Sequence, residues 1–221
     1  MNKTILFCNP QVNTTNPYIL VVGNKADLAG YVQVPVDEAQ MFRFSMRGEK
    51  MKPKRCTIVY AHCVTESGRK KTNGMNGKPH YNIKVAVLGE KQVGKTSLVA
   101  RYTYNTFNHN YLQTKGGDIT DKAIQHENKP IHVCIIDSAG HRYVRSLIKS
   151  LYREVHGILL VYDVTRRSTF EALDDWMDQI SLFVQRRDLQ HVECSAKTAQ
   201  GVSDAFDHLI HRTLSSKLIV S

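Results

Sequence analysis

Short apolar runs alternate with polar and amphipathic stretches along most of the chain, and this alternation predicts its architecture. Three runs rich in valine, isoleucine and leucine are expected to form strands: Tyr18–Val22, Ile83–Leu88 and Gly157–Tyr162, of which the first and the last are expected to be buried. His191–Cys194 is expected to form a last short strand. Asp118–His126 and Ile131–Ile136 are expected to form a hairpin, with its turn at Glu127–Pro130. Residues 105–117 are expected to form a polar loop, and Cys56–Ala61 an added edge strand.

Helices are predicted between these strands. One begins at Lys95 and ends near Tyr104, and acidic residues indicate another that begins at Asp37. A capping box at Ser168–Glu171 predicts a helix reaching about Val184, and a short helix is expected over Arg142–Arg153. The spacing of one apolar set predicts a final amphipathic helix: Val202, Ala205, Phe206, Leu209, Ile210 and Leu214. Such alternation of strands and helices favours a doubly wound α/β fold.

The most informative stretch is Gly89–Thr96, which reads Gly-Glu-Lys-Gln-Val-Gly-Lys-Thr and has the spacing G-x-x-x-x-G-K-[ST]. It stands between a predicted strand and a predicted helix. Glycines there allow backbone N–H groups to surround phosphate oxygens, and the positive end of the helix dipole adds to them. Lys95 would neutralise the β- and γ-phosphates, and the Thr96 hydroxyl would ligate Mg²⁺. A chance glycine turn would not require the strand and the helix on either side.

Composition limits the remaining classes. At 221 residues with 42% hydrophobic content the chain fits one globular domain with an appendage, and no run approaches the length of a membrane span. Five cysteines without a secretory signal predict reduced thiols in the cytosol. The net charge of +10 is concentrated in residues 45–80, where nine basic side chains face two acidic ones. This segment is a solvated linker, or it contacts acidic lipid or nucleic acid.

The motifs together resemble the Ras-like small GTPases, the Rab branch most of all, over nearly all of residues 81–221 and over residues 16–44. Asp137-Ser-Ala-Gly140 resembles D-x-x-G, and Asn24-Lys25-Ala26-Asp27 resembles N-K-x-D. Ser195-Ala196-Lys197 resembles S-A-K. The resemblance implies a mostly parallel, six-stranded P-loop GTPase sheet with helices on both faces. It also implies GTP or GDP and Mg²⁺ as cofactors.

The resemblance also implies roles for single residues. Thr114 would close on Mg²⁺ and the γ-phosphate, Phe107 would pack on the guanine, and Asp27 would choose the base. The Gly140 N–H would sense the γ-phosphate, and Asp137 would reach the metal through water. The metal set is therefore Thr96, Thr114 and Asp137, and the catalytic set is His141, Lys95, Thr114 and Gly140. The nucleotide set is Asn24, Lys25, Asp27, Gly89, Glu90, Lys91, Gln92, Val93, Gly94, Lys95, Thr96, Ser97, Phe107, Thr114, Gly140, Ser195, Ala196 and Lys197.

The order of the motifs departs from the family. N-K-x-D should lie between the helix ending near Val184 and the strand at His191, but only a few residues join these elements. The missing strand and helix resemble residues 16–44 at the N-terminus. We therefore expect residues 1–44 to supply a strand, the motif and a helix, residues 45–80 to be a basic linker or extension, and residues 81–221 to form the core. The opposing interpretation is a remnant that does not dock, which would leave base recognition impaired.

Two substitutions bear on catalysis. His141 stands where most family members have a glutamine that orients the attacking water, and Lys91 stands where they have a small residue. The Lys91 side chain either crowds the γ-phosphate or turns outward, and crowding is the favoured interpretation. Both predict slow hydrolysis of GTP. Lys115 and Ile136 replace an apolar residue and a tryptophan on the partner-binding face.

The resemblance further implies nucleotide-dependent partners: effectors, an exchange factor and a GTPase activator. The last residues, Ser216–Ser221, contain no cysteine, so a prenyl anchor is not expected. We expect a cytoplasmic monomer that visits membranes transiently, with a domain-swapped dimer as the alternative. The leading hypothesis is a Rab-like molecular switch, and its alternative is a catalytically silent binding or scaffold protein with impaired guanine recognition.

Overall fold

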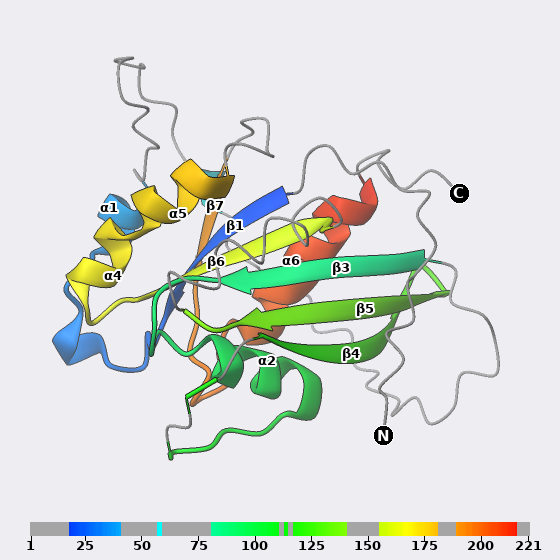
Figure 1. Ribbon diagram of the computed structural model, residues 1–221, viewed down its shortest axis with the longest axis horizontal. Coiled ribbons are helices and arrows are strands. Elements are labelled where there is room, and N and C mark those ends of the chain that lie inside the picture. The colour runs from blue at the N-terminus through cyan, green and yellow to red at the C-terminus, as the bar shows by residue number, and fades with distance from the viewer. Residues whose placement is uncertain are drawn as a thin grey trace.

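The computed structural model describes residues 18–40, 57–58, 81–110, 113–114, 117–140, 155–180 and 189–215 (Figure 1). The strands are β1 Tyr18–Asn24, β2 Thr57–Ile58, β3 Tyr81–Leu88, β4 Gly117–His126, β5 Lys129–Ser138, β6 Gly157–Asp163 and β7 Gln190–Glu193. The helices are η1 Ala29–Tyr31, a 3₁₀ turn, α1 Val36–Gln40, α2 Lys95–Tyr104, α4 Arg167–Glu171, α5 Leu173–Ile180 and α6 Val202–Ser215.

These strands form one sheet in the order β2-β7-β1-β6-β3-β5-β4, in which only β4 runs antiparallel to its neighbour. The doubly wound α/β fold predicted from the sequence is confirmed. Within the described residues the sheet has the six expected strands and, in addition, the two-residue edge strand β2, which lies inside the predicted Cys56–Ala61. Strand β1, from the N-terminal part of the chain, pairs with β6 on one side and with β7 on the other.

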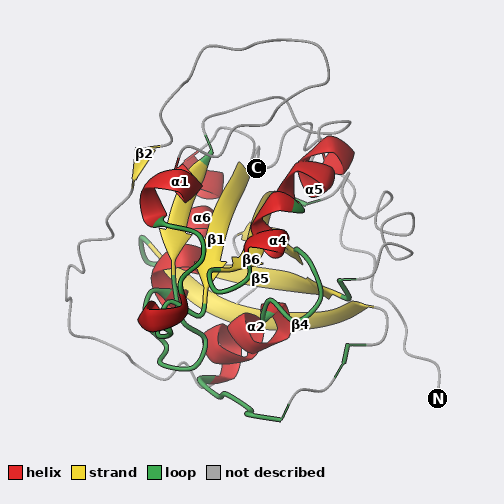
Figure 2. Ribbon diagram, turned by 90° about the vertical axis from the view of Figure 1, so that its left-hand side faces the viewer, coloured by secondary structure: helices red, strands yellow, loops and turns green. Residues whose placement is uncertain are grey.

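Helices cover both faces of the sheet (Figure 2). On one face α2 and α6 pack on a core whose largest member from α6 is Phe206, stacked on Tyr102 at a centroid distance of 4.2 Å. On the other face α1, α4 and α5 pack on a second core around Trp176 and Tyr162. All seven residues of β6 are buried, as expected for a central strand covered on both sides. Strand β1 contributes side chains to both cores, because alternate residues of a strand point to opposite faces.

The hairpin turn is shorter than the sequence analysis predicted. Glu127 and Asn128 form it alone, with φ angles of 49° and 60°, and Lys129 and Pro130 already belong to β5. Two successive residues with positive φ are the signature of the tight turn that matches the twist of the flanking strands. The predicted four-residue turn was therefore wrong. Asparagine at the second position accepts a positive φ, so two residues are enough to reverse the chain.

The predicted capping box at Ser168–Glu171 was also wrong. Arg166 is the N-cap residue of α4, and no side-chain hydrogen bond caps that helix. The chain turns earlier because the Asp163 carboxylate accepts bonds from the Thr165 N–H and hydroxyl, while the Thr169 hydroxyl accepts the Asp163 N–H. The helix then divides at Ala172, so that α4 and α5 replace the single predicted helix.

Several expectations lie outside the described residues: the helix at Arg142–Arg153, the end of a helix at residues 181–184, and the roles of His141 and Lys115. The helix predicted to begin at Asp37 corresponds to α1, which begins at Val36. In the part of the chain that the structure describes, no helix is long and apolar enough to cross a membrane.

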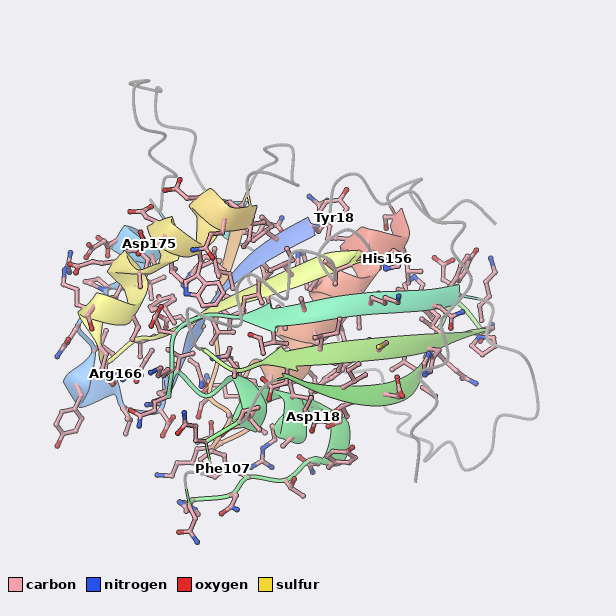
Figure 3. The ribbon with its side chains drawn as sticks, in the orientation of Figure 1. Tyr18, Phe107, Asp118, His156, Arg166 and Asp175 are labelled. Atoms are coloured by element: carbon pink, nitrogen blue, oxygen red, sulfur yellow. The ribbon has the colours of Figure 1, made fainter. Side chains whose placement is uncertain are left out.

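A buried histidine lies at the end of the sheet opposite to Phe107 and Arg166 (Figure 3). His156 is 6% exposed, and its Nδ1 accepts the Lys84 backbone N–H at 3.0 Å. Its Nε2 is buried without a hydrogen-bond partner among the described residues. Burial, and then the Lys84 charge, lower the pKa of His156 to about 4.

This histidine predicts a loss of stability in acid. Its pKa in the folded chain lies below the unfolded value of 6.5, so the unfolded chain binds the proton first as pH falls. The free energy of unfolding should fall between pH 7 and pH 5 by about 2 kcal/mol more in the wild type than in His156→Asn, whose amide oxygen still accepts the Lys84 N–H. Urea unfolding at both pH values measures this. His211→Asn, an exposed control, should follow the wild type, and equal losses in all three proteins would contradict the assignment.

Candidate nucleotide-binding site

A cavity of about 590 Å³ lies at the carboxyl ends of β1, β3 and β5. Such a position at the strand ends is where open α/β sheets bind ligands. The structure brings fourteen of the predicted site residues into its lining: Asn24, Lys25, Asp27, Lys91, Gln92, Gly94, Lys95, Thr96, Ser97, Phe107, Thr114, Gly140, Ala196 and Lys197. The predicted residues Gly89, Glu90, Val93, Asp137 and Ser195 do not line the cavity, and each bonds to or packs on a neighbouring segment instead.

The phosphate loop has the backbone geometry that its glycines predict. Gly89 has a φ of 137°, and a Cβ there would lie 2.1 Å from the Val161 carbonyl oxygen, so no other residue fits. Gly94 has a φ of 94° directly before α2 begins. The Lys95 ammonium donates to the carbonyl oxygens of Gly89 and Glu90 at 3.0 and 2.7 Å. Burial lowers the pKa of Lys95 to about 8, although the Asp137 and Glu90 carboxylates oppose this shift.

Two side chains from the α4–α5 side brace this loop from outside. The Trp176 Nε1–H donates to the Glu90 carboxylate at 3.1 Å, and the Arg166 guanidinium donates to the Lys91 carbonyl oxygen at 3.0 Å. Arg166 is itself held by the Asp163 carboxylate at 2.9 Å. The sequence analysis missed both braces and the carboxylate that holds Arg166. Asp163 alone had a signal, because it ends a buried apolar run at the edge where ligands bind.

Oxygen atoms converge beside the start of α2. The Thr96 hydroxyl donates to Asp137 Oδ2 at 2.5 Å and lies 2.8 Å from the Thr114 hydroxyl. The other carboxylate oxygen, Asp137 Oδ1, is buried with no hydrogen-bond partner among the described residues. Burial raises the pKa of Asp137, while the Thr96 hydroxyl and Lys95 counteract it. An unpartnered carboxylate oxygen beside two hydroxyls suits a hard cation, so these residues fit Mg²⁺.

The opposite end of the cavity is tied together by β1. The Asn24 side chain donates to the Val93 carbonyl oxygen at 2.8 Å and accepts the Ala196 N–H at 3.1 Å. The Ser195 hydroxyl donates to Asp27 Oδ1 at 2.6 Å. Lys25 pairs with the Asp163 carboxylate at 2.6 Å, which lowers the pKa of Asp163 despite its burial. Asn24 thus links the phosphate loop to the segment at Ser195–Lys197.

Arg101, on α2, holds that last segment in place. Its guanidinium donates to the carbonyl oxygens of Ala196 and Lys197 at 2.8 and 3.0 Å. Phe107 stands at the same end, with its ring edge-on to His109 at a centroid distance of 5.1 Å. The sequence analysis did not name a further group of lining residues: Leu28, Ala100, Asn108, His109, Asn110, Gln113, Ser138 and Ala139. All eight lie within three residues of a predicted site residue, and that proximity was the available signal.

A phosphate loop between a parallel strand and a helix, on a doubly wound sheet, defines the class of P-loop nucleotide-binding proteins. The chain belongs to the Ras family of small GTPases and is related to the Rab proteins. The family model described as "Ras family" matches residues 84–187. Ras-related protein Rab-18-B of Danio rerio is 33% identical over 162 residues, which take up 60% of this chain and 79% of that protein. Rab-18 of Lymnaea stagnalis is 30% identical over 162 residues, or 60% and 80% of the two chains. Rab-1A of Dictyostelium discoideum is 37% identical over 109 residues, or 49% and 54%.

Proposed function

We propose that the chain is a Rab-like guanine-nucleotide switch whose base-recognition motif, Asn24–Asp27, enters the site from the N-terminal side of the phosphate loop. The observation that carries the proposal is the convergence of this motif, the phosphate loop, Thr114 and Ala196–Lys197 on one cavity. Lys95 and the loop N–H groups would hold the phosphates. Thr96, Thr114 and Asp137 would hold Mg²⁺, which supplies charge neutralisation at the phosphates.

Guanine recognition rests on the Asp27 carboxylate. Guanine presents two neighbouring donors, its N1–H and its 2-amino group, and adenine offers no such pair. A carboxylate can accept both bonds, and Ser195 fixes the position of one of its oxygens. Phe107 would pack on the flat face of the base. Asn24 would keep the base end and the phosphate loop in register through its two backbone bonds.

The comparisons support the transposed order. Each alignment with a Rab-18 protein named above covers 162 positions but only 60% of the 221 residues, about 133, so about 29 positions lie opposite a gap in this chain. The alignment with Rab-1A covers 109 positions and 49% of the chain, about 108 residues, and therefore has almost no gap. The match to the family model ends at residue 187, shortly before β7 begins at Gln190. The segment proposed to fill the gap, residues 16–44, has a similar length.

The switch would act through Thr114 and Gly140, which line the cavity at its phosphate end. Gly140 lies so close to the phosphate loop that a Cβ there would be 2.6 Å from Lys91 N, so its N–H can approach a γ-phosphate where a side chain would not fit. Binding of GTP would order these loops and hydrolysis would release them. We propose that effectors, an exchange factor and a GTPase activator recognise these states in vesicle trafficking, with transient visits to membranes. Ile119 of β4 is 57% exposed and offers such partners an apolar contact, whereas Ile136 is buried.

The nucleotide content of the purified protein tests this function. We expect guanine nucleotide to be released on heat denaturation, and labelled GDP to bind at least a hundredfold more tightly than labelled ADP, because two hydrogen bonds to the half-buried Asp27 carboxylate are at stake. Chromatography of the supernatant and competition binding provide the measurements. Equal, weak affinity for GDP and ADP would instead support the catalytically silent scaffold.

Slow hydrolysis is the second part of the proposal. Lys91 is exposed at the cavity, and Arg166 holds its carbonyl oxygen. Its backbone nitrogen lies close to Gly140, so its side chain begins beside that glycine. An ammonium there would disturb the placement of the γ-phosphate and water, and His141 would orient that water poorly. Single-turnover GTP hydrolysis should therefore be about tenfold faster in a His141→Gln, Lys91→Gly double variant. The matched control is Lys129→Gly, which removes an exposed lysine at the start of β5, away from the cavity, and should keep the rate of the wild type. Equal rates in the wild type and the double variant would contradict this explanation.

A further inference from the structure

Strand β1 occupies a slot between β6 and β7 without being covalently continuous with either strand. Along its whole length, Tyr18–Asn24, it pairs with β6, and Leu20–Gly23 pair with β7. Between α1 and β3 the chain runs through residues 41–80, of which Thr57–Ile58 pair with the outer edge of β7. We call residues 18–40 the N-terminal unit. It enters the sheet as a separate piece, held by non-covalent contacts and one long connection.

We propose that the bound nucleotide is a third component of this interface: it bridges the N-terminal unit to the rest of the domain, so that nucleotide binding and docking of the unit are mutually dependent. This inference rests on the proposed function, because it takes the cavity as the nucleotide site. The cavity wall comes from both pieces. Asn24, Lys25, Asp27 and Leu28 belong to the unit, and the phosphate loop, Phe107 and Ala196–Lys197 belong to the remainder.

The contacts at the cavity end of the unit are polar, and they join it to the phosphate loop, to the end of β6 and to the segment Cys194–Ala196. Asn24 bonds to Val93 and Ala196, and Lys25 bonds to Asp163. Asp27 bonds to Ser195, and the Ala26 N–H bonds to the Cys194 carbonyl oxygen. A guanine held by Asp27 on one side and by Phe107 and the Ala196 segment on the other would add contacts that exist only when both pieces are present. A ligand that contacts both partners of an interface stabilises their association.

The other end of the unit is held by contacts that need no nucleotide. Val34 and Ala39 are buried in the second core, and the Gln33 side chain accepts the Arg167 N–H. The Arg167 guanidinium also pairs with the Glu38 carboxylate. These contacts explain why the unit can lie in the sheet. They offset the entropy that is lost when these 23 residues become ordered. That loss is larger here than for a unit joined to the domain by short loops at both ends, because one long connection restricts the undocked unit less.

The coupling has a functional consequence. In this motif order the base-recognition residues can leave the site together with their strand, while the phosphate loop stays in an unbroken chain from β3 to α2. Undocking of the unit would therefore open the base end of the cavity and release the nucleotide. By reciprocity, the factor by which nucleotide strengthens docking equals the factor by which docking strengthens nucleotide binding.

The test uses the full chain with a recognition site for a specific protease inserted between Asn73 and Gly74. The protein is purified with GDP and Mg²⁺ and then cleaved without denaturant. We expect the N-terminal piece to dissociate at least tenfold more slowly in GDP with Mg²⁺ than after removal of nucleotide by EDTA and phosphatase, measured by size-exclusion chromatography over time. ADP with Mg²⁺ is the matched control and should not slow dissociation.

Amide hydrogen exchange on the uncut chain provides a second measurement. Protection of the Leu20–Val22 amides should rise at least tenfold on addition of GDP. Equal dissociation and equal protection with and without GDP, in a protein whose uncut form binds GDP, would overturn the bridging role and leave the proposed function intact. Separation of the pieces during cleavage in saturating GDP would overturn it as well. An uncut protein that binds no guanine nucleotide would overturn the proposed function instead.

Discussion

Replacement of Lys95 by alanine is expected to lower the affinity for GTP by a hundredfold or more. Lys95 is 5% exposed and its ammonium donates to two carbonyl oxygens of the phosphate loop, so it points into the loop. A hydrogen bond between two charged groups in such a place contributes on the order of 3 kcal/mol, and that corresponds to a factor of about a hundred. Equilibrium competition against labelled GDP measures the loss.

The control is Lys129→Ala, which removes the same charge from an exposed position at the start of β5. Its affinity should stay within about threefold of the wild type, because a distant charge acts only through the screened long-range field. If the two variants lost affinity equally, net charge and not the phosphate loop would be responsible. If Asp27 contacts the base and not the phosphates, as proposed, Asp27→Gly should leave the binding of inorganic triphosphate unchanged.

The sequence predicted the elements whose local pattern decides their structure. The run at Gly157–Tyr162 is apolar at every position, and a strand buried on both faces is the structure that such a run favours. The glycines of the phosphate loop likewise predict its shape, because their φ angles are unfavourable for other residues. Strand β1 was predicted for the same reason as β6, although its place in the chain is unusual.

The features that the sequence did not predict depend on contacts between residues far apart in the chain. The turn before α4 is set by the Asp163 carboxylate, so a capping box that satisfies the local rule at Ser168 is not used. The braces of the phosphate loop from Trp176 and Arg166 span more than seventy positions of sequence. Such pairs have no periodic signature, and only the packing of α5 and α4 beside the loop brings them together.

The largest change in specificity is expected from Asp27→Asn. The Ser195 hydroxyl donates to Asp27 Oδ1, so the amide oxygen of the variant should take that position and leave the amide NH₂ facing the cavity. Xanthine carries an oxygen where guanine has its 2-amino group, and it therefore accepts from an amide where it repels a carboxylate.

The variant should bind GTP about ten- to a hundredfold more weakly and xanthosine triphosphate more tightly by a similar factor, since a mispaired buried edge costs about 1–3 kcal/mol. Competition between the two triphosphates measures both changes. Asp37→Asn, the same charge change at an exposed position of α1, should keep the preference of the wild type. An unchanged preference in Asp27→Asn would mean that the N-terminal unit does not recognise the base. A changed preference that appears only in dimers would mean that the unit of one copy completes the site of another, because the slot between β6 and β7 accepts the same strand from either chain.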